Sequence, residues 1–425
     1  MRVTGERIRE VGTARPRRLP VAALAALLAL TAACSSKDSP AWKDGPPAPK
    51  ASATITTPAA DAKDVPAATE IVFTTKDATE TAVELKDASG QAVEGALSAD
   101  GKSWLPDAAL EYGAEYTATV TATGDDGKAA TATSTFTTMA KPANQVRVTS
   151  FIGDDQVVGV GMPLIVKFGR AIPEDVRADV QRRMTVQTTP AQEGAWRWIS
   201  STEVHYRPKE FWQAGTRLQY KVQVGGLPMG GDWYGRADLT IDAKVGPSFI
   251  MSVDNATKRM TVTKDGNVVK TILVSLGKKS TPSSSGTMLV MEKFKHTVFD
   301  TTTELGPEDG YRTDIDFAQR ITYGGEFIHA APWSEGKQGS VNVSHGCVNV
   351  SEADGKWLFE QTRIGDPITV KGTERQLKNG NGWTDWNLSW EEYVEGSAIP
   401  YVPADETGGT DDADDTDGTS ATPSE

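Results

Sequence analysis

The sequence predicts a mainly β protein of several domains. Short runs that alternate apolar and polar residues recur along the chain, for example at 116–122 and 220–224. Gly-Asp, Asp-Gly and Ser-Gly pairs, which are typical of tight turns, separate these runs. At 425 residues, the chain is too long for one hydrophobic core, because single domains rarely exceed about 250–300 residues. We therefore expect about three folded domains in series.

Two of these expected domains share a faint internal repeat. In the segment 53–140, Trp104-Leu105-Pro106 ends seven positions before Gly113. In the segment 145–244, Tyr206-Arg207-Pro208 ends seven positions before Gly215. A strand rich in Thr, Tyr and Val follows each glycine. The repeat predicts two immunoglobulin-like β-sandwich domains. We see no cluster of reactive side chains in either and interpret both as spacers, with His205 a packed or surface histidine.

A third domain is expected from 246 to 371, with strand-like runs at 248–253, 259–263 and 268–275. Ser351 opens a capping-box pattern, which predicts a short helix that ends near Gly365. Beyond it, 372–403 forms a Trp-rich C-terminal extension, which we expect to fold back onto the third domain.

The chain ends differ from the body in composition. Residues 1–33 combine a basic region with a short apolar run closed by small residues, which predicts an export signal. The sequence at 30–34 resembles a bacterial lipoprotein lipobox, which implies acylation of Cys34; a plain secretory signal is the alternative. Residues 34–52 then form a flexible stalk. At the other end, 404–425 is predicted to be a disordered acidic tail.

The charge balance excludes one class of partner. The net charge is −13, and the last 21 residues hold eight acidic and no basic side chains. A phosphate-binding surface needs clustered Lys and Arg, so we expect no nucleic-acid partner.

Cysteine usage points to chemistry in the third domain. The chain has only two cysteines, and if Cys34 carries lipid, Cys347 has no disulfide partner. His345 lies two residues before this thiol, whereas His329, sixteen positions before His345, would reach it only if two strands or their loops pair. An imidazole can lower the pKa of a thiol or take its proton during attack. Gly346 leaves main-chain N–H groups open to hold an oxyanion. The predicted helix follows Cys347, and its dipole would favour a thiolate.

At this point the sequence resembles a known family. His329, fourteen intervening residues, and then Ser344-His345-Gly346-Cys347 with Asn349 match the motif of the L,D-transpeptidase catalytic domain (YkuD-type). The order of the segments is similar to that of actinobacterial lipoproteins of this family, which carry two immunoglobulin-like domains before the catalytic domain. The resemblance covers about 53–397 and implies a YkuD-type β-sandwich with a short helix.

The resemblance also implies an enzyme mechanism without cofactor or metal. Cys347 attacks the diaminopimelate carbonyl of a tetrapeptide stem, releases D-alanine and forms a thioester. His329 acts as the base, oriented by the Ala330 carbonyl, and a diaminopimelate amine of a second stem resolves the thioester. Ser344, His345 and Gly346 shape the surroundings of the thiol. Carbapenem-type β-lactams are expected to acylate it.

The resemblance further implies that the substrate cleft is lined by Tyr311, Gly324, Gly325, Asn349 and Trp333. Tyr311 belongs to a lid-like segment that begins near His296. Trp333 has core packing as its alternative. The expected location is the outer face of the cell membrane, lipid-anchored and reaching into the wall. Three alternatives stay open: an L,D-carboxypeptidase, a non-catalytic wall-binding lipoprotein, and an enzyme that attaches other proteins to peptidoglycan. A zinc site at the His329, His345 and Cys347 cluster is weak, because it lacks a fourth ligand.

Overall fold

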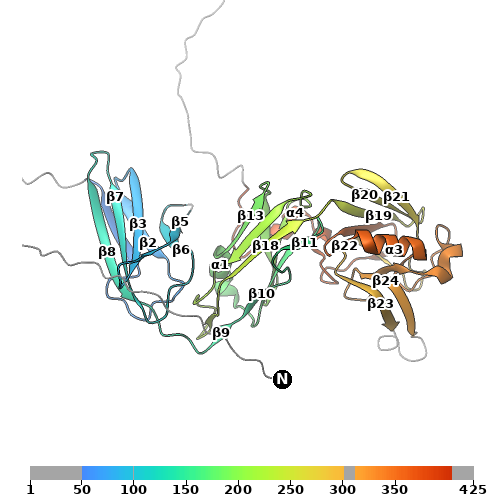
Figure 1. Cartoon of the computed structure of the whole chain (residues 1–425), viewed down its shortest axis with the longest axis horizontal. Coiled ribbons are helices and arrows are strands. Elements are labelled where there is room, and N and C mark those ends of the chain that lie inside the picture. Colours follow the sequence, from blue (N-terminus) through green and yellow to red (C-terminus); the bar gives the residue numbers. More distant parts are fainter. Residues whose placement is uncertain (1–49, 99, 301–311, 404–425) are drawn as a thin grey trace, which may run out of the picture. The chain divides into compact units, whose positions relative to one another are not determined.

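The computed structural model describes residues 50–98, 100–300 and 312–403 (Figure 1). The predicted export signal, Cys34, most of the stalk, Tyr311 and the acidic tail lie outside these residues. Within the described ranges, no helix is long and apolar enough to cross a membrane. The described chain is built mainly of strands, as its sequence predicts.

The first domain is a sandwich of two four-stranded sheets. One sheet has the order β1 (Ser52–Thr57), β2 (Ile71–Lys76), β6 (Ser103–Pro106) and β5 (Gly95–Leu97). The other has the order β4 (Ala92–Val93), β3 (Glu80–Asp87), β7 (Glu115–Thr123) and β8 (Ala129–Thr137). Strand β7 buries every second residue, so its alternating sequence places one face in the core. Phe73, Leu85 and Trp104 fill the space between the sheets.

The second domain is also a sandwich, but it contains a helix that the strand patterns did not predict. One sheet has the order β10 (Val148–Ser150), β12 (Leu164–Phe168), β15 (Glu203–Pro208) and β14 (Gly194–Ser200). The other has the order β11 (Gln156–Val158), β18 (Leu239–Val245), β16 (Arg217–Val222) and β13 (Met184–Thr189), and β9 (Gln145–Val146) pairs with β17 (Tyr234–Gly235). Helix α1 (Glu174–Arg182) is short and consists mostly of charged and polar residues, and only Val180 and Gln181 are buried.

The third domain places two sheets around its own core. The larger sheet has the order β21 (Asn267–Leu273), β20 (Arg259–Lys264), β19 (Phe249–Asp254), β27 (Pro367–Lys371), β22 (Ser284–Leu289) and β28 (Arg375–Gln376). The smaller has the order β23 (Glu292–Asp300), β24 (Arg312–Arg320), β25 (Phe327–Ala330) and β26 (Val348–Val350). The 3₁₀ turn η1 (Pro332–Lys337) follows β25.

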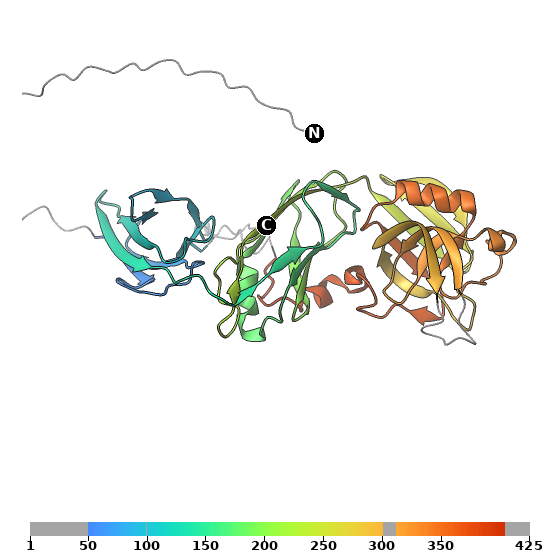
Figure 2. The same ribbon diagram turned by 60° about the horizontal axis from the view of Figure 1, so that its bottom comes forward.

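Helix α3 (Glu352–Gln361) lies against the smaller sheet (Figure 2). Its predicted cap is confirmed, because the Ser351 hydroxyl accepts a hydrogen bond from the Asp354 N–H at 3.1 Å. The helix ends at Gln361, earlier than the expected end near Gly365. A Cβ on Gly355 would lie 2.9 Å from the Cβ of Ala330, so glycine lets the helix approach β25 closely.

The C-terminal extension follows the expectation only in part. Strand β28 joins the third domain, and η2 (Asp385–Asn387) contacts strand β22 of that domain. However, η2 also contacts the second domain, and α4 (Trp390–Val394) packs against strand β14 of the second domain. Trp386 donates to the Gly161 carbonyl at 2.6 Å, and the Arg207 guanidinium lies over the rings of Trp386 and Tyr393. The expectation that the Trp-rich extension folds onto the third domain therefore holds for one part of it, and the other part packs on the second domain. The Trp-rich composition indicates that the extension packs against a folded domain, but it does not indicate which domain.

Candidate active site

Parallel pairing of β25 with β26 assembles the site. His329 lies opposite Asn349 in this register, and Cys347 immediately precedes β26. Residues from two separate points of the sequence are therefore brought to one edge of the smaller sheet. The sequence placed His329 near the thiol only on condition that their segments pair, and the structure meets that condition.

The two residues open into one cavity of about 270 Å³. Its floor carries polar and reactive side chains, and its wall on the side of β23 and β24 is mainly apolar. The lining residues are Phe299, Thr313, Ile315, His329, Trp333, Val343, Ser344, His345, Cys347 and Asn349. Six of the residues predicted from sequence thus share one cavity. Phe299, Thr313 and Ile315 were not predicted, because nothing in their local sequence marks them.

His329 is held in one orientation. Its Nδ1 lies 2.7 Å from the Ala330 carbonyl, which can only accept a hydrogen bond, so Nδ1 carries the proton. Nε2 is then free of its proton and able to accept one. Burial lowers the pKa of His329 below its usual value, although the hydrogen bond to Ala330 opposes this shift. The imidazole is therefore a neutral base at neutral pH.

Trp333 lies beside this base at the cavity entrance. Its ring centroid is 5.9 Å from that of His329, and 60% of its surface is exposed. Core packing, the alternative for this residue, does not describe its position. An exposed indole next to the base is available to contact a ligand.

Cys347 is buried among apolar side chains, including Phe327 and Ile315. Burial raises the pKa of the thiol to about 12; a backbone hydrogen bond from Phe327 lowers it, and the nearby Glu326 carboxylate raises it further. Strand β26 separates Cys347 from helix α3, so the expected contribution of the helix dipole does not apply. The thiol is protonated at rest and needs a base.

The loop that carries the thiol is fixed by serine hydroxyls. Ser344 Oγ donates to the Cys347 carbonyl at 2.7 Å and accepts from the Gly346 N–H at 3.1 Å. Ser283 Oγ donates to the Gly346 carbonyl at 2.7 Å. Gly346 has φ +130°, which favours glycine. Because its N–H is already bonded, Gly346 does not supply the free oxyanion donor expected from sequence. Ser283 was not predicted, since it lies 64 positions before Cys347.

His345 faces solvent at the rim. Its Nε2 lies 2.9 Å from Lys278 Nζ, an ammonium that can only donate. Partial burial and the Lys278 charge both lower the pKa of His345, so this side chain is neutral. Lys278 is a further rim residue that sequence reasoning missed. Among the described residues, no group of three or more His, Cys, Asp or Glu side chains is arranged to hold a metal ion.

The predicted glycine pair forms the turn before β25. The Gly324 N–H donates to Asn381 Oδ1 at 2.7 Å, and the Gly325 carbonyl lies 3.8 Å from Cys347 Sγ. Gly325 has φ +85°, which suits glycine. Asn349 Nδ2 donates to Ser334 Oγ at 3.3 Å. These residues therefore surround the thiol or support its neighbours rather than all lining the cavity.

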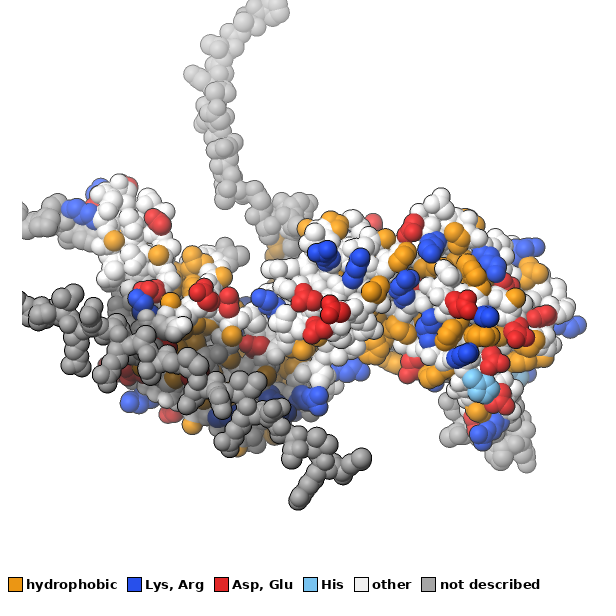
Figure 3. Space-filling model, viewed as in Figure 1, with side chains coloured by type: hydrophobic (Ala, Val, Ile, Leu, Met, Phe, Trp, Pro, Cys, Tyr) orange, Lys and Arg blue, Asp and Glu red, His pale blue; other side chains and the backbone are white. Residues whose placement is uncertain are grey.

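On the face shown in Figure 3, neither basic nor acidic side chains predominate. Lys and Arg side chains are interspersed with Asp and Glu over the region of β19 to β24, with small apolar patches between them.

A buried thiol and a neutral, oriented imidazole in one cavity define a cysteine enzyme that transfers acyl groups. Residues 248–370 match the L,D-transpeptidase catalytic domain family, and residues 62–228 match the bacterial Ig domain family. The chain is 36% identical over 332 residues to L,D-transpeptidase 2 of Mycobacterium tuberculosis (strain CDC 1551 / Oshkosh), covering 77% of this chain and 80% of that protein.

A second relative agrees with this match. L,D-transpeptidase 5 of Mycobacterium tuberculosis (strain ATCC 25618 / H37Rv) is 32% identical over 379 residues, covering 87% of this chain and 81% of that protein. A solved LD transpeptidase in complex with imipenem is 32% identical, covers 54% of this chain and 100% of that one, and has a TM-score of 0.47. The chain belongs to the L,D-transpeptidase family.

Proposed function

We propose that this enzyme cross-links peptidoglycan by joining diaminopimelate residues of two stem peptides. The observation that carries the proposal is the pairing of Cys347 with a His329 whose Nδ1 is fixed on the Ala330 carbonyl. This arrangement leaves Nε2 as the proton acceptor beside a neutral thiol. The same pair can serve both halves of an acyl transfer.

In the first half, the donor is a tetrapeptide stem. Cys347 Sγ attacks the carbonyl of the third residue as its proton moves to His329 Nε2. The resulting oxyanion collapses, the bond to the terminal D-alanine breaks, and the leaving amine takes the proton from the imidazolium. A thioester remains on Cys347. Transfer of the proton during attack avoids a free thiolate, which the burial of Cys347 disfavours.

In the second half, an amine of another stem replaces the leaving group. His329 Nε2 takes a proton from this amine as it attacks the thioester carbonyl. Collapse expels the sulfur, which regains the proton from the imidazolium. The product is an amide between two stems, and the enzyme returns to its starting state. Phe299 and Ile315 give the cavity an apolar wall on the side of β23 and β24, and the balance between amine and water as acceptor is decided by the product assay below.

The direct test is incubation of the chain with a disaccharide-tetrapeptide, followed by mass spectrometry. A cross-linked dimer that lacks one D-alanine is expected, and Cys347→Ala must abolish it. Tripeptide without dimer would assign a carboxypeptidase instead. An unchanged substrate would favour a non-catalytic wall-binding protein. Attachment of proteins to the wall would be favoured if a protein acceptor added to the same assay became amide-linked to the peptide, as distinct from the thioester on Cys347.

A β-lactam offers the same thiol a strained amide carbonyl. Ring opening by Cys347 leaves no separate leaving group, so the acyl-enzyme persists. Incubation with a carbapenem should add one intact inhibitor mass to the wild-type chain and none to Cys347→Ala. Absence of the adduct from the wild type would contradict the assigned nucleophile.

The proposed location is the outer face of the cell membrane, with lipid on Cys34. The support is sequence alone: a basic and apolar leader, followed by the lipobox-like stretch at 30–34. The wild-type chain is expected in the membrane fraction, labelled by a fatty-acid analogue. Cys34→Ala should be unlabelled and released, whereas equal labelling of both would contradict lipidation at this residue.

A further inference from the structure

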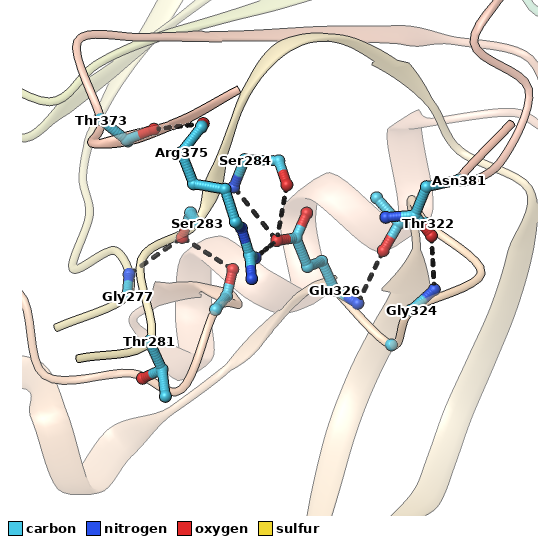
Figure 4. A network of polar contacts seen from close by, with 12 residues as sticks. Gly277, Thr281, Ser283, Ser284, Thr322, Gly324, Glu326, Thr373, Arg375 and Asn381 are labelled. Carbon is cyan, nitrogen blue, oxygen red and sulfur yellow. Dashed lines mark hydrogen bonds and ion pairs between the residues drawn. The ribbon is translucent and has the colours of Figure 1, made fainter. Parts of the chain in front are cut away.

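Behind the nucleophile's loop lies a buried carboxylate that the acyl-transfer mechanism does not use. Glu326 is the residue before β25, and only 4% of its surface is exposed. Its Oε1 accepts hydrogen bonds from the Ser284 N–H at 3.1 Å and from Ser284 Oγ at 3.0 Å, and it is paired with the Arg375 guanidinium (Figure 4). Its Oε2 has no hydrogen-bond partner. A buried, partly unsatisfied charge is costly and calls for a functional explanation.

This ion pair packs directly against the backbone of the thiol loop. A Cβ on Gly346 would lie 3.7 Å from Glu326 Oε1 and 3.6 Å from Arg375 Nη2. The next residue is Cys347, and the charge of Glu326 is one of the factors that raise the pKa of its thiol. Any negative charge that develops on sulfur or on an oxyanion would be opposed by an unpaired carboxylate here.

The other charged or titratable groups near the thiol do not offset this carboxylate. The described groups that line the cavity with Cys347 are His329 and His345, and both have lowered pKa values. Lys278 contacts the outer side of His345, at the rim. Arg375 is therefore the permanent cation that touches Glu326 itself.

Arg375 reaches this position through the C-terminal extension. Strand β28 pairs in parallel with β22, with Arg375 opposite Ser284. Thr373 Oγ1 lies 2.6 Å from Ser285 Oγ, and the Leu377 N–H donates to the Ser285 carbonyl at 2.7 Å. Both contacts flank Arg375 and fix its backbone. The residue lies beyond 370, where the match to the catalytic-domain family ends.

We propose that Arg375 is a positioning residue for the transpeptidase reaction: its guanidinium neutralises the Glu326 carboxylate and holds it against Gly346, so that the nucleophile's loop faces a neutral pair. The extension thereby completes the active site from behind. The proposal rests on Cys347 as the nucleophile, and it assigns no proton transfer to either member of the pair.

Opposite charge changes should move thiol reactivity in opposite directions. Arg375→Met leaves Glu326 unpaired, so alkylation of Cys347 by iodoacetamide should slow by about threefold or more toward the alkaline end of the pH range, where a carboxyl whose pKa is raised by burial is more fully ionised. Glu326→Gln leaves an unpaired guanidinium and should accelerate alkylation by a similar factor. The double variant should return close to the wild-type rate, and Arg375→Lys should retain most of it.

The experiment measures alkylation of the full chain by intact mass from about pH 6 to pH 10, with Cys34→Ala in every variant to leave one thiol. Lys371→Met is the matched control, since it breaks an exposed ion pair with Asp254 in the same sheet. Cross-linking of tetrapeptide is measured in parallel. Because alkylation needs no peptide, failure of cross-linking in the wild type would count against the proposed function and leave this inference standing.

Two results would overturn the inference. One is a pH profile that is unchanged in both single variants. The other is an equal loss of reactivity in both single variants that the double variant does not restore, because a purely structural brace behaves in that way. If Arg375→Met fails to fold, Glu326→Gln and the double variant still decide, since acceleration in the first and a wild-type rate in the second are required.

Discussion

At Cys347, burial opposes the chemistry that the residue performs. A thiol with a pKa raised to about 12 holds almost no thiolate at neutral pH. The His329 imidazole, whose pKa is lowered by burial, is neutral and carries its one proton on Nδ1. The resting pair is therefore neutral, unlike the thiolate–imidazolium pairs of cysteine enzymes with strongly lowered thiol pKa values. The proton moves only when a carbonyl is attacked.

This neutral pair predicts a characteristic pH dependence of thiol reactivity. Alkylation of Cys347 by iodoacetamide in the absence of substrate should rise about tenfold per pH unit up to about pH 10, without a plateau. Intact-mass kinetics on a chain with Cys34→Ala would measure this rise, with Cys347→Ala as the blank. A plateau reached below about pH 8 would instead indicate a stabilised thiolate.

Ser283 gives a second prediction at the residue scale. Its Oγ donates to the Gly346 carbonyl at 2.7 Å and accepts from the Gly277 N–H at 2.9 Å. Ser283→Ala loosens the loop that carries Cys347. The rate at which a carbapenem acylates Cys347, followed by intact mass, should therefore fall by about tenfold or more, because small misplacements of reacting groups are costly. Ser340→Ala, an exposed serine bonded to the Lys337 carbonyl, should leave the rate unchanged. Equal rates for both variants would contradict this role for Ser283.

At the scale of elements, the sequence predicted what is local and missed what is distant. The cap of α3, the strands and the His329–Cys347 pairing follow from short patterns and one linear motif. Ser283, Lys278 and Arg375 reach the site through sheet pairing and loop contacts, which no local pattern encodes. Helix α1 was missed because it is short and offers few apolar residues within a mostly charged segment.

Asp366, in the turn before β27, carries a prediction about stability. It is fully buried, and its Oδ1 has no hydrogen-bond partner, while Oδ2 accepts from the Arg363 N–H at 2.7 Å. Burial raises the pKa of Asp366 to about 7, although the Arg363 N–H and nearby cations lower it. The folded state thus binds a proton that the unfolded state has released, so stability falls as pH rises from about 4 to 7.

Asp366→Asn removes this ionisation and keeps the acceptor for Arg363. The variant should gain roughly 1–4 kcal/mol of unfolding free energy at about pH 8 and little at about pH 4. Thermal denaturation across this pH range measures the gain. Asp125→Asn, at an exposed ion pair with Lys50, should show no such trend. A gain that does not depend on pH would contradict the raised pKa.

At the scale of the whole molecule, a buried histidine ties the C-terminal extension to the second domain. His205 was expected to be an isolated packed or surface residue, but its Nδ1 lies 2.9 Å from Asp385 and its Nε2 lies 2.8 Å from Glu203. Both ring nitrogens therefore donate, and the imidazole is charged. Tyr393 adds a hydrogen bond to the His205 carbonyl at 3.1 Å. Since Arg375 lies in the same extension, this attachment also bears on the active site.

The attachment should weaken in alkali. Burial alone would lower the pKa of His205, but the carboxylates of Asp385 and Glu203 outweigh it and raise the pKa to about 9. The stabilisation that charged His205 gives to the folded state is complete below about pH 6.5, the pKa of histidine in the unfolded chain. It is lost as the pH rises through about 9, the pKa of His205 in the folded chain. Hydrogen exchange of residues 385–397, corrected for intrinsic rates, should therefore increase between about pH 7 and pH 10, while exchange in the first domain stays constant. His205→Gln should show fast exchange at both pH values, and His296→Gln, which removes an exposed histidine paired with Asp316, should behave as the wild type. Slow exchange of 385–397 in His205→Gln would mean that the aromatic contacts around Arg207 suffice to hold the extension without the charged histidine.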